Sequence, residues 1–295
     1  MTLRDVDIET SGRLTAHESV RLGVIDYLNV VPVYDWLLRN ESNDGLLSGV
    51  QTVAGVPAQM NRAMAAGEVD ISNVSSFAYG EHTRDWLLAP HLSVAADGRV
   101  DSVLLFSWRK DWRALDGGSV ALTDHSATSI ALTRLLCERR YGARPLYVTC
   151  PPDLERMLAE HDAALLIGDI ALVEGYSRRE IAGRGQPYVF DLAAEWKAWT
   201  NLPFVFAVWA VRTARAEAVR ESGALELLRT SKEHGLLTLD ALADSAARRL
   251  GLPHTVCAEY LRLLDYELTE RDLVGLRTFL EMVTPDFTWS DVHFA

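Results

Sequence analysis

The feature that most constrains the fold is a unit that recurs along the chain, in which a short apolar strand ends in a polar turn and a helix follows at once. In residues 21–34, RLGVIDYLNVVPVY, the apolar run 22–25 is followed by a polar break, and Pro32 marks the first turn of a helix. Similar turns follow at Ser75 and Ser76, at residues 126–129, and at Gly168 and Asp169. Because amides at a helix start carry partial positive charge, we expect these turns to converge on one small anion.

The order of the elements predicts an α/β protein whose last part is a cover of helices. Strands and helices alternate up to about residue 212, and from Thr213 on the pattern is helical without intervening strands. The expected strands cover residues 22–25, 51–53, 69–74, 103–107, 119–122, 146–148, 163–167, 189–191 and 203–211. The expected C-terminal helices cover residues 214–233, 239–250, 255–264 and 269–282. In such folds ligands bind beyond the carboxyl ends of the strands, where all the polar turns lie.

Length and charge narrow the class of protein. With 295 residues, of which 48% are apolar, the chain can bury a large core and form about two domains. A net charge of -12 argues against nucleic acid or an anionic membrane as a partner. Residues 1–20 contain no apolar run typical of a signal peptide, and no later stretch has the length of a membrane span, which predicts a cytoplasmic protein.

Hydroxyl side chains are concentrated at the polar turns. Ser75 and Ser76 can each cap a helix, whereas the turn after residue 122 carries more hydroxyls than one cap requires, namely Thr123, Ser126, Thr128 and Ser129. Gly168 allows close backbone approach, and Asp169 either caps the next helix or meets a substrate hydroxyl. No metal or cofactor is implied, because the sequence has no HExxH, Cys/His ligand spacing, GxSxG, GxGxxG or P-loop.

Several motifs together resemble those of a known family. They are YLN followed by Pro32, GEVDIS with the serine pair and Tyr79, VDSVLLFS at 100–107, S-x-T-S at 126–129, LLIGD-x-AL at 165–172, and LPFVFAVW at 202–209 after Trp196 or Trp199. In this order, over about residues 20–283, they resemble chorismate dehydratases of the futalosine route to menaquinone. Members of that family remove water from chorismate to give 3-[(1-carboxyvinyl)oxy]benzoate. The resemblance implies a carbon-oxygen lyase (hydro-lyase) without a cofactor, acting on a small dianion; it implies no oligomeric state.

The resemblance also implies a two-lobe periplasmic-binding-protein-like type II fold, with the ligand in a cleft between the lobes and a C-terminal helical segment. The chain is expected to cross between lobes near residues 108–111 and 207–210. Lobe one then comprises residues 1–108 plus 210–295, and lobe two comprises residues 109–209.

The resemblance assigns roles to residues of the polar turns. Asn29 orients the substrate near the reacting carbons, or alternatively caps a helix, and Ser102 binds the departing hydroxyl or the enolpyruvyl group. Asp169 positions Thr128 or the substrate, or serves structure alone. The remaining substrate-binding residues, which hold carboxylates or complete the turns, are Tyr27, Ser75, Ser76, Ser126, Thr128, Ser129 and Gly168. No Lys or Arg lies in the turns, so hydroxyls, backbone amides and helix ends have to hold the dianion. Each favourable helix end is worth roughly 0.3 to 1 kcal/mol.

The identity of the general base and two rival functions stay open at this point. Asp26 and His125 are the nearest titratable residues, and the enolpyruvyl carboxylate of the substrate itself is the favoured third alternative. One rival is a non-catalytic small-anion binding protein of the same fold. The other is 1,4-dihydroxy-6-naphthoate synthase, whose family has an SPCPNDTF-like stretch where this chain reads DYLNVVPV.

Overall fold

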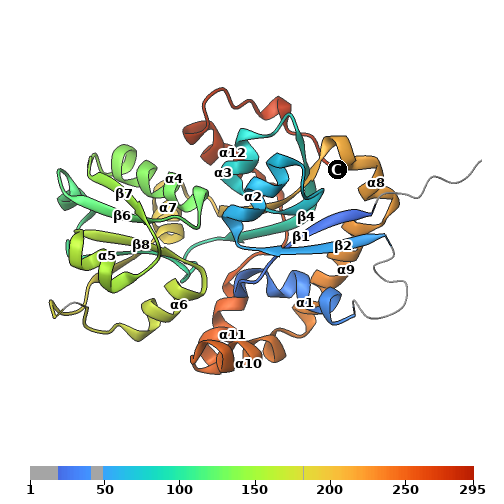
Figure 1. Cartoon of the computed structure of the whole chain (residues 1–295). Helices are drawn as coiled ribbons and strands as arrows, with labels where there is room; N and C mark the ends of the chain where they lie inside the picture. The colour runs from blue at the N-terminus through green and yellow to red at the C-terminus, as the bar shows by residue number, and fades with distance from the viewer. Residues whose placement is uncertain (1–18, 41–48, 182) are drawn as a thin grey trace, which may run out of the picture.

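Two β-sheets with helices around them make up the molecule (Figure 1). The computed structural model describes residues 19–40, 49–181 and 183–295. The first sheet has the order β2 (Val50–Gly55), β1 (Val20–Ile25), β3 (Ile71–Ser75), β10 (Phe204–Arg212) and β4 (Trp86–Ala96). The second has the order β7 (Leu146–Cys150), β6 (Ser119–Thr123), β8 (Ala163–Ile167), β5 (Val103–Ser107) and β9 (Tyr188–Asp191). Each sheet with its helices is called a lobe below, and the predicted two-lobe α/β architecture is confirmed.

The direction of the strands places the polar turns. In the first lobe β1 pairs in parallel with β2 and β3, and β10 runs antiparallel between β3 and β4. In the second lobe β6 pairs in parallel with β7 and β8, and β5 runs antiparallel between β8 and β9. Carboxyl ends of parallel neighbours lie at one edge of a sheet, so β1 and β3 present their turns together, as do β6 and β8.

The chain changes sheet twice, and both changes come earlier than predicted. β5 pairs with β8 and β9 in the second sheet, so the first crossing occupies residues 97–102 rather than 108–111. All of β10 pairs in the first sheet, so the second crossing precedes Phe204 rather than falling at 207–210. The run VLLFS reads as a buried strand in either lobe, and only its pairing partners decide the lobe to which it belongs.

The predicted C-terminal helical segment is present on the first lobe. It consists of α8 (Ala216–Glu221), α9 (Ala224–Leu237), α10 (Leu239–Leu250), α11 (His254–Leu263) and α12 (Glu270–Val283). The helix expected at 214–233 divides at Gly223, whose φ of 69° no regular helix adopts. α12 begins with a capping box in which Thr269 and Asp272 each satisfy the other's backbone amide.

The other helices follow the strands closely. In the first lobe they are α1 (Val31–Arg39), α2 (Pro57–Ala66) and α3 (Ser76–Glu81). In the second lobe they are α4 (Ala127–Leu135), α5 (Leu154–Glu160), α6 (Gly168–Ser177) and α7 (Leu192–Thr200), with a π-helical turn at Leu136–Arg140. Pro32 and Pro57 lie in the first turns of α1 and α2, where a missing amide donor costs nothing.

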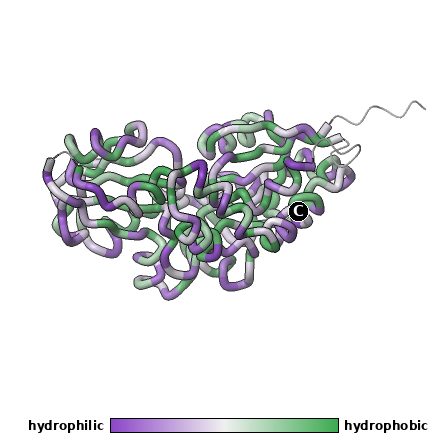
Figure 2. Tube along the Cα trace, turned by 90° about the horizontal axis from the view of Figure 1, so that it is seen from below, coloured by the Kyte–Doolittle hydropathy of each residue, from purple (hydrophilic) through white to green (hydrophobic). Residues whose placement is uncertain are grey.

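Aromatic packing holds the second crossing in place. The Trp196 ring of α7 meets the rings of Phe204 and Phe279 edge-on, with centroids 5.4 and 6.1 Å away, and its indole N–H donates to the carbonyl of Pro203. Figure 2 shows hydrophobic segments toward the middle of each lobe and hydrophilic ones on many outer turns. In the described part of the chain no helix is long and apolar enough to cross a membrane. Residues 1–18, on which the predicted cytoplasmic location partly depends, lie outside the described residues.

Candidate functional site

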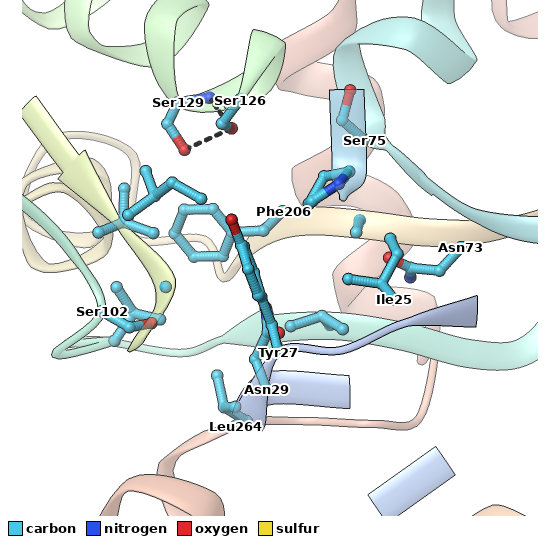
Figure 3. Close-up of a pocket in the computed structure, with 17 residues that line it drawn as sticks. Ile25, Tyr27, Asn29, Asn73, Ser75, Ser102, Ser126, Ser129, Phe206 and Leu264 are labelled. Carbon is cyan, nitrogen blue, oxygen red and sulfur yellow. Dashed lines mark hydrogen bonds between the residues drawn. The ribbon is translucent and has the colours of Figure 1, made fainter. Parts of the chain in front are cut away.

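A pocket lies between the lobes, at the strand ends where the polar turns meet (Figure 3). It contains about 580 Å³ of space, part of it open to solvent. Both lobes and the first crossing contribute to its wall. The lining residues are Ile25, Tyr27, Asn29, Pro57, Asn73, Ser75, Val94, Val100, Ser102, Val103, Ser126, Ser129, Ile167, Gly168, Phe206, Ala207 and Leu264.

The wall of this pocket is neutral. None of its lining residues is Asp, Glu, Lys, Arg or His, and Tyr27 is the lining residue that can ionise. Burial, and then the charges of Asp169 and Asp124, raise the pKa of the Tyr27 phenol above 10.0, which keeps the phenol protonated. A ligand therefore meets dipoles and hydrogen-bonding groups but no opposite charge.

Seven of the ten predicted site residues line the pocket. They are Tyr27, Asn29, Ser75, Ser102, Ser126, Ser129 and Gly168. Asn29 belongs to a 3-10 turn, Leu28–Val30, and it caps no helix, since the cap of α1 is Val30. Its Oδ1 is buried and has no partner among the described residues. A buried polar atom without a partner is costly, so Asn29 is suited to a ligand.

The pocket serines are held by neighbouring donors. Ser75 caps α3 and accepts from the amide of Ala78 at 3.3 Å. Ser126 caps α4, accepting from the amide of Ser129 at 3.2 Å and donating to its hydroxyl at 2.9 Å. Figure 3 shows Ser126 and Ser129 on the side of the pocket toward which the Tyr27 hydroxyl points. Hydroxyl groups from both lobes are thus fixed around one space.

The other three predicted site residues, Ser76, Thr128 and Asp169, are not among the residues that line the pocket. Ser76 donates its hydroxyl to the carbonyl of Val205 at 2.7 Å and so ties α3 to β10. Sequence places all three at the polar turns, but the direction of each side chain is set by contacts with segments far away in the chain.

Thr128 and Asp169 instead join the two lobes. The Thr128 hydroxyl accepts from the amide of Phe77 at 2.9 Å. Asp169 accepts from the amide of Leu28 at 3.0 Å through Oδ1, and its Oδ2 lies 2.8 Å from the Arg249 guanidinium. The structure therefore has its lobes in contact on more than one side of the pocket.

Gly168 and Tyr27 form another contact between the lobes. Gly168 has a φ of 66°, and a Cβ added to it would lie 3.1 Å from two carbons of the Tyr27 ring. The Tyr27 hydroxyl lies 3.1 Å from Nδ1 of His125 on the opposite lobe. A larger residue at 168 would strain the backbone and push the Tyr27 ring away, so glycine is required for this close approach.

Neither titratable candidate for the general base lines the pocket. Asp26 is exposed, and the His125 ring lies between the Tyr27 hydroxyl and Asp124, whose Oδ1 is 3.5 Å from Nε2. Among the described residues no three His, Cys, Asp or Glu side chains form a metal-binding group.

Asn73 is a pocket residue that sequence reasoning missed. It is 4% exposed, and its Nδ2 donor has no partner among the residues that the structure describes. Asn73 lies two positions before Ser75 on β3, and alternate residues of a strand face the same side. That alternation was the available signal, since it puts the Asn73 amide beside the Ser75 hydroxyl. The apolar part of the wall, which includes Phe206 and Leu264, was also not predicted.

Comparisons with known proteins agree with this architecture. A family model described as menaquinone biosynthesis matches residues 20–285. A chorismate dehydratase of Thermus thermophilus is 38% identical over 271 residues, which cover 88% of this chain and 93% of that protein. A structure from Archaeoglobus fulgidus matches with a TM-score of 0.71 at 18% identity, covering 91% of this chain and 97% of the other. The periplasmic aliphatic sulphonate binding protein of Escherichia coli matches with a TM-score of 0.61 at 17% identity, covering 90% of this chain and 86% of the other. At these identities the two structures show the fold alone.

Proposed function

The chain belongs to the menaquinone biosynthesis family and is a homologue of chorismate dehydratase, and from that premise we propose that it is a hydro-lyase converting chorismate to 3-[(1-carboxyvinyl)oxy]benzoate. The observation that carries the proposal is the pocket between the lobes, whose wall combines neutral hydrogen-bonding groups with apolar side chains. Chorismate is a small dianion with an apolar ring, and this wall offers both kinds of contact.

The reaction requires stabilisation of charge more than a reactive side chain. The ring proton beside the enolpyruvyl ether is acidic because the electron pair left behind delocalises toward the ring carboxylate. That C–H bond breaks and its electron pair forms a C=C bond while the neighbouring C–O bond breaks. The proton taken from carbon balances the one that the departing hydroxide takes up, so the net loss is one water molecule and the ring becomes aromatic. Donors fixed around the ring carboxylate stabilise the charge that develops there, and they need no reorganisation during the reaction.

The pocket residues divide among these tasks. We assign to Asn29 the orientation of the substrate near the reacting carbons, and to Ser102 the hydrogen bond to the departing hydroxyl or the enolpyruvyl group. Ser75 and Ser129, which belong to different lobes, bind carboxylates. The apolar wall, including Phe206, packs on the ring and excludes water, which strengthens each hydrogen bond in the pocket.

The enolpyruvyl carboxylate of the substrate is proposed as the proton acceptor. The lining residues include no carboxylate or imidazole, and the Tyr27 phenol is held protonated. A carboxylate that is already part of the bound molecule lies near the acidic proton without any cost of bringing two reactants together. The protein then contributes position and electrostatics rather than a base.

Incubation of the purified full chain with chorismate tests this function. The expected product is 3-[(1-carboxyvinyl)oxy]benzoate, separated by chromatography and identified by its aromatic absorbance and mass. Saturable binding of chorismate without product would favour a non-catalytic binding protein of the same fold. If chorismate is neither bound nor converted, the proposed function is refuted.

A further inference from the structure

Two residues outside the pocket wall touch its serines, and we propose that Asn61 and Tyr260 are positioning residues that turn the hydroxyl protons of Ser75 and Ser102 toward the ligand. The proposal rests on the proposed function of the pocket as the site of a dianion. Neither Asn61 nor Tyr260 lines the pocket. Each acts through the serine that it contacts.

Asn61, on α2, brackets Ser75 with both ends of its amide. The Ser75 backbone amide donates to Asn61 Oδ1 at 3.1 Å, and Asn61 Nδ2 lies 3.1 Å from the Ser75 hydroxyl. A backbone N–H can only donate, so Oδ1 must face it, and Nδ2 is then left to face the hydroxyl. This network fixes the orientation of the Asn61 amide.

The Ser75 oxygen consequently has both lone pairs occupied. Asn61 Nδ2 donates to one, and the amide of Ala78 donates to the other at 3.3 Å. A serine oxygen has two lone pairs and one proton, so this hydroxyl can act only as a donor. Ser75 is 7% exposed and lines the pocket, and its proton has no acceptor in the described part of the chain. A carboxylate in the pocket supplies that acceptor.

Tyr260, on α11, performs the same task for Ser102. Its hydroxyl donates to the Ser102 hydroxyl oxygen at 2.9 Å, and both residues are buried, at 1% and 2% exposure. If Ser102 donated instead, the phenol proton would be left in a buried place without an acceptor among the described residues, which is costly. Burial raises the pKa of Tyr260, so the phenol keeps this proton. The Ser102 proton is therefore free for the pocket.

The arrangement suits an anion site without positive charge. A free serine hydroxyl rotates and can present either its proton or a lone pair to the ligand. Donors behind Ser75 and Ser102 remove the second option before the ligand arrives, and a hydroxyl that accepts a hydrogen bond also becomes a stronger donor. Donors fixed in advance are the form of electrostatic stabilisation that needs no rearrangement.

A double-mutant cycle tests the Tyr260 pair. Tyr260→Phe is expected to lower kcat about 5- to 10-fold, as loss of one hydrogen bond does, with KM changed less than about 2-fold. In the background of Ser102→Ala, Tyr260→Phe is expected to lower kcat less than about 2-fold, because the hydroxyl that Tyr260 positions is absent. If Ser102→Ala is too slow for a steady-state assay, the cycle is measured from single-turnover rates with enzyme in excess over chorismate.

Tyr266→Phe is the matched control for a purely structural effect. Tyr266 is buried at 3% exposure, and its hydroxyl has no partner among the described residues, so its removal should leave kcat within about 2-fold. Equal losses in Tyr260→Phe and Tyr266→Phe, or a loss from Tyr260→Phe that persists in Ser102→Ala, would overturn the assignment of Tyr260.

A second cycle tests Asn61. Asn61→Asp replaces the Nδ2 donor by an acceptor of the same shape, so the Ser75 proton turns to it and away from the ligand. We expect KM for chorismate to rise about 10-fold, and Ser75→Ala to abolish most of this difference. Gln59→Glu adds the same charge to the same helix while keeping its acceptor for the Val56 amide, and it should change KM less than about 2-fold. An equal rise in Gln59→Glu would refute positioning by Asn61.

The wild-type chain separates failure of this proposal from failure of the proposed function. If wild type turns over chorismate and the two cycles are additive, the positioning roles are wrong and the function stands. If wild type binds chorismate without turnover, the function is wrong and so is the role of Tyr260 in turnover, while the Asn61 cycle is read as the Kd for chorismate. If wild type neither binds nor converts chorismate, both proposals are wrong.

Discussion

Substitution of Asp169 tests whether this carboxylate joins the lobes or acts on the substrate. Asp169→Asn keeps an oxygen that can accept from the Leu28 amide but loses the charge that pairs with Arg249. Asp169→Ala loses both contacts. Asp169 belongs to the second lobe and both of its partners belong to the first. Losing these contacts therefore destabilises the closed arrangement, in which the lobes touch, relative to an open one.

The magnitudes follow from burial. Leu28 is 1% exposed, and an amide left there without an acceptor costs about 1 to 3 kcal/mol. The Arg249 side chain is 43% exposed, so solvent screens its pairing with Asp169, which is worth about 0.2 to 1 kcal/mol. Asp169→Ala is therefore expected to destabilise the closed arrangement by about 1 to 3 kcal/mol more than Asp169→Asn does. This difference corresponds to roughly 5- to 150-fold in the ratio of closed to open molecules.

Calorimetry with chorismate and small-angle scattering measure the two consequences. We expect the apparent Kd to rise strongly in Asp169→Ala, together with the radius of gyration of the free protein, and to change less than about 5-fold in Asp169→Asn. Arg249→Ala should match Asp169→Asn, since both remove the same ion pair. Equal loss of affinity in Asp169→Asn and Asp169→Ala, at unchanged radius, would refute the bridging role and favour direct action on the ligand. Tighter binding by Asp169→Asn would instead show that its charge repels the dianion.

The remaining predictions concern catalysis and acid stability. Asn29→Ala should lower kcat by about 10² to 10³ while calorimetry still detects chorismate binding; a loss below about 10-fold would remove Asn29 from the catalytic residues. Asp26→Asn and His125→Asn should each keep turnover within about 10-fold, and a loss of ~10² or more in either would identify a protein base. Burial opposes ionisation of Asp70, but hydrogen bonds and charge from Arg21, then the charge of Arg215, lower its pKa below 3.8. The stabilisation by this ion pair is then complete above pH 3.8 and is lost as the pH falls through the lowered pKa. The free energies of unfolding of wild type and Asp70→Asn, measured with denaturant, should therefore differ at pH 6 and converge in strong acid. A difference that stays constant with pH would contradict this.

Local patterns predicted most elements of the fold, because strand, turn and helix signals lie within a few residues of one another. β4 was not predicted: its sequence WLLAPHLSVAA contains Pro90, and His91 has a φ of 66°. β5 was predicted as a strand but assigned to the wrong lobe. The sheet in which a buried apolar strand pairs depends on partners about 60 to 90 residues away, and periodicity within the strand carries no information about them.

The candidate site was predictable in position but only partly in detail. The polar turns marked the pocket, since strand ends of one sheet meet at one edge. Ser75 and Ser76 are adjacent in the sequence, yet only Ser75 faces the pocket, because Ser76 is turned toward the Val205 carbonyl. The supporting contacts of Asn61 and Tyr260 come from helices about 14 and 158 residues away from their serines. Such contacts form only in the folded molecule, and no spacing in the sequence predicts them.

The segment by which the chain first passes from one sheet to the other also forms part of the pocket wall, since Val100 and Ser102 belong to that crossing, and Phe206 lies on β10, the strand that follows the second crossing. A hinge motion of this molecule would bend or twist the segments that connect the lobes. Residues that contact the ligand would then also be part of the hinge. Redesign of this part of the wall for a bulkier guest would then alter how fast the molecule admits and releases it, and a change in selectivity should come with a change in exchange rate.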